Sequence, residues 1–180
     1  AFYNCKNIEN ITLPQTLWKI DDMALWGCEK IKKLELTSKI SSVGSYVFRD
    51  CKALEEIIVV PENTYFKSVD GILYEKKKYM RMMVCPAMKQ GIVTVADGMH
   101  EIGTEAFHDC KYVTEVILPE SLETINSSAF EGCSALEKIE LPDNIEQIGM
   151  YAFEDCTALK SVKLPARLTD IDQAVFVGCE

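Results

Sequence analysis

Apolar side chains recur along this chain with a fixed 23-residue period, which differs from the spacing of a single helix or strand. Each repeat contains a short alternation of apolar and polar residues, such as Ile139 and Leu141, which is typical of a half-buried strand. A proline such as Pro142 follows most of these strands, because proline cannot continue a hydrogen-bonded ladder. Two more aliphatic residues, such as Ile145 and Ile148, then predict a second extended segment.

A second recurring element is a phrase close to Ala-Phe-x-x-Cys. The spacing of its Phe and Cys predicts a short helical or 3₁₀ turn that buries both side chains. A period of this length is typical of a solenoid, because one repeat cannot bury its own apolar residues without its neighbours. The phrase ends at seven cysteines, which keep the 23-residue spacing on each side of one interruption: Cys5, Cys28, Cys51, Cys110, Cys133, Cys156 and Cys179.

The pattern therefore predicts a single domain over residues 1–180, an α/β repeat solenoid with one strand per turn in a parallel sheet. Repeats are expected to begin at residues 1, 24, 47, 106, 129 and 152. The interruption, at about residues 61–96, keeps alternating apolar stretches, which predict a β-hairpin that turns at Glu75–Lys78. The basic residues at 76–81 are expected to form a solvated turn. Val93 and Val95 then resume the strand positions in register, so the interruption should be a stacked module.

Composition excludes several classes of partner. The net charge is −9 and the isoelectric point is about 4.8, whereas nucleic acids and anionic membranes require a basic surface. No apolar run reaches the roughly 18 residues that a membrane-spanning helix needs, so no membrane insertion is expected. The chain starts and stops within a repeat, and we therefore expect it to be a fragment of a longer protein.

Eight cysteines raise the question of disulfides, zinc or catalysis. Zinc sites usually contain Cys-x-x-Cys pairs or neighbouring histidines, and here His100 and His108 are the only histidines. We expect no metal and no cofactor, and we expect reduced thiols that pack as a column of small apolar groups. His108 lies near Cys110, but residues so close in sequence rarely face each other. No catalytic residue is expected, and the chain is not predicted to be an enzyme.

Residues 129–151, AFEGCSALEKIELPDNIEQIGMY, resemble the BspA-like or Treponema-type leucine-rich repeat, and six near-complete copies are present. The segment FKSVDGILYEKKK at residues 66–78 is similar to a degenerate unit of that family. The resemblance implies a right-handed leucine-rich-repeat fold in an extracellular or cell-surface protein of bacteria. It also implies adhesion to a host or matrix protein, without a common catalytic site. A structural spacer stalk and a carbohydrate-binding module that uses exposed aromatic residues are the alternatives.

Residues that break the repeat pattern are the candidate binding residues. The outward strand positions are mostly polar, but Ile58 and Ile117 occupy two of them beside the hairpin module. They either form an apolar contact site or are covered by the hairpin, and coverage is the favoured interpretation.

Three aromatic residues near the N-terminus also stand at nominally exposed positions: Tyr3, Trp18 and Trp26. They are either interface anchors or pack against one another or against preceding repeats. In the glycan-binding alternative, the same three residues would stack on sugars.

Overall fold

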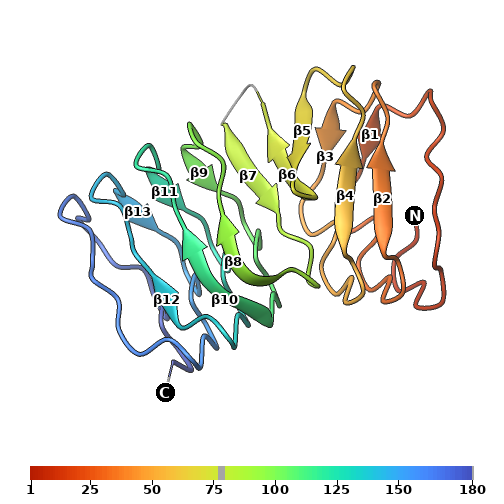
Figure 1. The fold of residues 1–180 in the computed structure, drawn as a ribbon. Helices are drawn as coiled ribbons and strands as arrows, with labels where there is room; N and C mark the ends of the chain where they lie inside the picture. The colour runs from red at the N-terminus through yellow and green to blue at the C-terminus, as the bar shows by residue number, and fades with distance from the viewer. Residues whose placement is uncertain (77–79, 180) are drawn as a thin grey trace.

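The computed structural model describes residues 1–76 and 80–179, which form an elongated β-solenoid with the two termini at opposite ends (Figure 1). The strands lie on two long faces of the solenoid, and those of the second face are two residues long in the regular turns. The first face contains two parallel sheets, β2–β4 and β8–β10–β12. Their strands are β2 (Lys33–Leu36), β4 (Glu56–Val59), β8 (Gln90–Thr94), β10 (Tyr112–Ile117) and β12 (Lys138–Ile139).

The second face is built from the aliphatic residues near the end of each repeat. Its parallel pairs are β1–β3, β9–β11 and β11–β13. The predicted parallel solenoid is therefore confirmed. The strands of this face are β1 (Lys19–Ile20), β3 (Ser42–Val43), β9 (Glu101–Ile102), β11 (Thr124–Ile125) and β13 (Gln147–Ile148).

The interruption forms an antiparallel unit within the second face. β5 (Phe66–Val69) pairs with β6 (Ile72–Glu75), which pairs with β7 (Arg81–Val84), and β7 joins β9 in parallel. The predicted hairpin is thus β6–β7, although residues 77–79 of its expected basic turn lie outside the described residues. A second hairpin, which we did not predict, turns at Asp70–Gly71. Both residues have positive φ, at 50° and 72°, as the tight Asp-Gly turn requires.

The predicted helical or 3₁₀ turns, and with them the α/β class, are wrong. Across residues 1–76 and 80–179 there is no helix of either kind. We call the segment that holds each Ala-Phe-x-x-Cys phrase a corner. Each corner contains separate turns, with bonds such as Glu131 N–H to Ser128 O at 3.2 Å and Cys133 N–H to Phe130 O at 3.1 Å. Ser128 and Gly132 have positive φ, at 55° and 74°. A left-handed residue on each side of the turn stops a right-handed helix from forming.

Neighbouring corners are joined by a backbone ladder of their own. Phe130 N–H donates to Ala152 O at 2.7 Å, and Gly132 N–H donates to Glu154 O at 2.8 Å. The buried rings stack in the same direction, with centroid separations of 4.8, 5.0 and 5.3 Å along the series Phe107, Phe130, Phe153 and Phe176. The corner is therefore bonded and packed from one repeat to the next.

All eight cysteines are free, and six of them are buried. The thiols do more than fill space, because most donate a hydrogen bond across the repeat boundary. Cys133 Sγ lies 3.1 Å from Phe107 O, and Cys156 Sγ lies 3.2 Å from Phe130 O. Burial raises the pKa of Cys156 to about 12, which keeps this thiol protonated as a donor.

The residue just before each corner cysteine is either Asn, Asp or Gly, always with positive φ. An Asn or Asp side chain lies over the glycine of the next repeat. A Cβ added at Gly132 would stand 2.5 Å from Asp109 Oδ1. Three such pairs occur: Asn4 with Gly27, Asp109 with Gly132, and Asp155 with Gly178.

Candidate functional site

The corner is interrupted at the inserted module, which supplies strands but no Ala-Phe-x-x-Cys phrase. The corners at residues 47–51 and 106–110 therefore face each other across a notch. Its hollow has a volume of about 170 Å³ and is lined by both corners and by Met83, Cys85 and Ala87 of the module. We call this feature the notch.

The backbone ladder is broken on one wall of the notch. In the part of the chain that the structure describes, the N–H groups of Tyr46, Phe48 and Asp50 have no backbone acceptor. On the other wall, Ala106 O accepts a bond from Cys85 N–H at 2.6 Å. Phe48 is half-buried, whereas Phe107 is fully buried. The missing corner thus leaves main-chain donors and an aromatic ring partly uncovered.

Arg49 spans the notch. Its guanidinium forms an ion pair with Glu105 and donates to Glu131 Oε1 at 3.2 Å. It also lies over the ring of Trp26, 5.3 Å from the ring centroid. The Glu105 side chain is only 8% exposed, so Arg49 supplies the countercharge for a largely buried carboxylate.

Three aromatic residues lie in a row beside Arg49. The ring centroid of Trp26 is 5.8 Å from that of Tyr3 and 6.1 Å from that of Tyr46. Trp26 is half-buried, and its Nε1 donates to Asp50 Oδ2 at 3.0 Å. Tyr3 is 54% exposed. We call Tyr3, Trp26 and Tyr46 the aromatic ridge.

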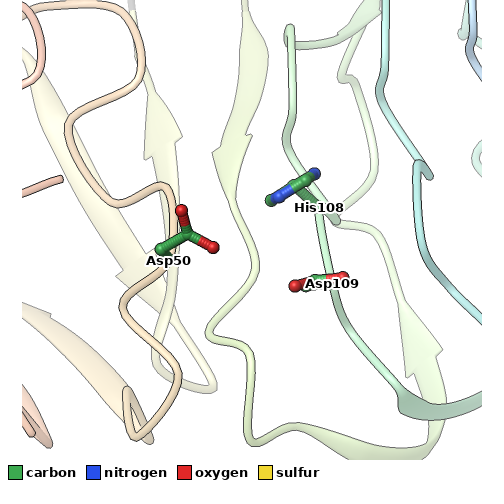
Figure 2. A group of neighbouring side chains, drawn as sticks. All are labelled: Asp50, His108 and Asp109. Atoms are coloured by element: carbon green, nitrogen blue, oxygen red, sulfur yellow. The ribbon is translucent and has the colours of Figure 1, made fainter. Parts of the chain in front are cut away.

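His108 lies on the opposite wall, with a side chain that is 10% exposed. Its Nδ1 is buried and has no hydrogen-bond partner in the described chain; the nearest carboxylate, Glu131, is 3.6 Å away. Burial, followed by the charge of Arg49, lowers the pKa of His108. Figure 2 shows Asp50 on one wall and His108 and Asp109 on the other. These three residues offer ligand atoms within 4.8 Å of one another.

The structure separates the three predicted aromatic residues. Tyr3 and Trp26 come together in the aromatic ridge, but Trp18 is 62% exposed and, within the described ranges, makes no ring contact. The two tryptophans therefore do not pack against each other. Tyr46, which completes the ridge, and Arg49, which lies over Trp26, were missed. The available signal was their place in the last regular phrase before the interruption.

Ile58 and Ile117 are 37% and 46% exposed, so the favoured interpretation that the hairpin covers them is wrong. The second hairpin, β5–β6, instead reaches the edge of β4, where Ile57 N–H donates to Gly71 O at 2.8 Å and Val59 N–H donates to Ser68 Oγ at 3.1 Å. It thereby pairs with the strand's backbone and leaves its outward side chains open. Ile58 lies in β4 and Ile117 in β10, which belong to different sheets.

The thiol of Cys110, two residues after His108, is not activated as a nucleophile. Cys110 is buried, and its Sγ lies 3.6 Å from Cys85 O. Hydrogen bonding with Cys85 and burial raise its pKa well above the ordinary value, whereas a nucleophilic thiol requires the opposite shift.

The repeat profile described as the BspA type leucine rich repeat region matches six copies in this chain, over residues 1–70 and 85–180. The chain belongs to this family. No curated protein matches the sequence significantly. In the described ranges, no helix has the length and apolar character needed to cross a bilayer.

Three solved structures have a similar fold. A leucine-rich repeat protein from Eubacterium ventriosum has 21% identity and a TM-score of 0.86 over 95% of this chain. A leucine-rich cell surface protein from Faecalibacterium prausnitzii has 24% identity and a TM-score of 0.75 over 97% of it. The pneumococcal vaccine antigen PcpA has 25% identity and a TM-score of 0.74 over 82% of it. The aligned part is 46%, 52% and 42% of those proteins respectively, so this chain spans about half of each or less.

Proposed function

We propose that this chain is a non-enzymatic protein-binding module of an extracellular or cell-surface bacterial protein, and that it adheres to a host or matrix protein. The aromatic ridge carries this proposal. Tyr3 and Trp26 stand at the position that later repeats fill with charged residues such as Glu131 and Glu154. Tyr, Trp and Arg dominate the binding energy of protein interfaces, and Arg49 lies directly beside the ridge.

The broken ladder supports a polypeptide ligand. In the described part of the chain, the N–H groups of Tyr46, Phe48 and Asp50 lack a backbone acceptor and are spaced two residues apart, like the donors Phe130 and Gly132 that join neighbouring corners in the regular half. A surface location is supported by the relatives, one of which is a cell surface protein and another a vaccine antigen.

The arrangement of the ridge disfavours glycan binding through Tyr3, Trp18 and Trp26. Sugar stacking needs an open ring face, but Tyr3 and Arg49 both lie against the Trp26 ring. Trp18 is exposed and, among the described residues, makes no ring contact with either of them. A glycan module would therefore depend on Trp18, whereas a protein-binding module depends on Trp26.

The test uses residues 1–180 against a panel of purified extracellular-matrix proteins and a glycan array. We expect binding to a matrix protein that weakens about thirtyfold in Trp26→Ala, corresponding to an interface hot spot of about 2 kcal/mol. Tyr151→Ala is the matched control, because Tyr151 is as exposed as Tyr46 but lies away from the notch. Thermal melts of each variant check folding.

Other outcomes would contradict the proposal. Array binding that is lost in Trp18→Ala and kept in Trp26→Ala would identify a carbohydrate module. Failure to bind any protein or glycan on the panel would favour a spacer stalk, and stoichiometric labelling by an active-site-directed probe would indicate an enzyme.

A further inference from the structure

A second hollow opens beside the notch, with a volume of about 250 Å³. Asp50, His108 and Asp109 line it, together with Lys52 and Lys111. Asp50 belongs to the last corner before the inserted module, and His108 and Asp109 belong to the first corner after it. In Figure 2 the Asp50 carboxylate lies toward the wall that carries the other two side chains. Three potential ligands therefore converge from both sides of the break in the solenoid.

His108 provides independent support for a ligand here. Its side chain is nine-tenths buried, and its Nδ1 has no hydrogen-bond partner among residues 1–76 and 80–179. Buried polar atoms in folded proteins nearly always have a partner, so an orphaned imidazole nitrogen requires an explanation. Imidazole nitrogen is also the commonest protein ligand of transition metals.

Asp50 is available because the repeat order is broken after it. Asp109 and Asp155 each lie over the glycine of the next repeat, but no corner follows Asp50. Its carboxylate instead accepts the bond from Trp26 Nε1 at 3.0 Å. Such a bond from a neighbouring side chain orients a metal-binding carboxylate.

The surrounding charges favour a cation in this hollow. Glu105 and Glu131 also lie near His108, but both carboxylates are ion-paired with Arg49. Of the nearby lysines, Lys52 lies 3.8 Å from Glu29, and Lys111 lies 3.3 Å from Asp109 Oδ1. Lys111 is therefore the cation that a metal would have to displace.

We propose that Asp50, His108 and Asp109 bind one divalent transition-metal ion, which fastens the two walls of the notch together. One imidazole and two carboxylates suit Zn²⁺ or Co²⁺ better than Mg²⁺ or Ca²⁺, which prefer all-oxygen sites. Three protein ligands leave at least one coordination position for water. The metal would join the corners where the backbone ladder does not.

The experiment uses tag-free residues 1–180, stripped with a chelator and then dialysed against Zn²⁺ and, separately, Co²⁺. We expect one Zn²⁺ per chain by elemental analysis and a rise in the melting temperature. The Co²⁺ complex should show d–d bands without a thiolate-to-cobalt charge-transfer band, because no cysteine belongs to the site. His108→Gln and Asp50→Asn should weaken binding about a hundredfold or more, since loss of an outer partner alone costs 10- to 100-fold.

Two matched variants sharpen the test. His100→Gln should bind normally, because His100 is paired with Glu123 at 3.1 Å and lies outside the site. Lys111→Met should bind more tightly, because the competing ammonium is removed. The proposal is overturned if the wild-type chain retains no Zn²⁺, if His108→Gln retains as much as wild type, or if the cobalt spectrum shows thiolate ligation. Metal-free melts show whether each variant is folded.

Discussion

The series of corners within residues 106–179 and the series within residues 1–51 use the same phrase but pack it differently. In the C-terminal corner, four phenylalanine rings form a continuous stack. In the N-terminal corner, Leu25 replaces one phenylalanine, Phe2 is exposed, and Phe48 is half-buried beside the notch. The C-terminal series satisfies its contacts internally, whereas the N-terminal series leaves rings and main-chain donors available. Regular packing provides the scaffold, and its interruption creates the candidate site.

Ring truncation tests this comparison most strongly. Phe130→Ala should lower the free energy of unfolding by about 3–5 kcal/mol, because it removes a fully buried ring between two stacked neighbours. Phe48→Ala should cost clearly less, because its ring is already half-exposed. Urea denaturation measures both. Equal losses would show that the notch is as well packed as the regular corner.

The ion pair between Arg49 and Glu105, which joins the two walls of the notch, provides the next test. Arg49→Ala should destabilise the chain by about 3 kcal/mol, because it leaves the largely buried Glu105 without a countercharge. The double variant with Glu105→Gln should recover part of this loss, and the double-mutant cycle gives the coupling energy. A loss as small as that of an exposed ion pair, which is at most about 1 kcal/mol, would contradict a structural bridge.

The thiol column should behave alike in both halves. Burial raises the pKa values of Cys51 and Cys156 to about 12, from about 9.0 for an exposed thiol. Above pH of about 9 the unfolded chain loses these protons and the folded chain keeps them, so stability should fall as pH rises towards about 12. Each thiol should contribute about 1 kcal/mol for each pH unit in this range.

Alanine variants isolate this effect from other groups that titrate in alkali. Cys51→Ala and Cys156→Ala should each flatten the alkaline decline by a similar amount in urea denaturation at several pH values. If only Cys156→Ala flattens it, the column is not continuous through the N-terminal half.

The sequence predicted the structural features that the repeat determines by itself. The period located the parallel strands, the buried Phe107 and Cys133, and the resumption of register after the interruption. It did not predict the turns, because residues such as Ser128 and Tyr151 adopt left-handed backbone that their side chains do not announce.

The candidate site was harder to predict, because it depends on a missing element. Trp26 was identified as an exception to the pattern, but Arg49 and Asp50 look like ordinary variable positions, and His108 was considered only beside Cys110. They meet only because the inserted module adds strands without adding a corner. The spacing of the phrases marks the place of the interruption, but it does not show which side chains meet there.

The pairing of Asp109 with Gly132 has a consequence for how such arrays grow. The residue before the corner cysteine alternates between Asn or Asp and Gly, so at this one position the pattern repeats every second turn. Loss or gain of one repeat in the regular half would place a carboxylate against a side chain of the next turn. Alternatively, it would leave a glycine without the Asn or Asp side chain that lies over it. We therefore expect duplication and recombination to add or remove even numbers of repeats. A change by an odd number of repeats should be tolerated only at an interruption such as the inserted module after Asp50.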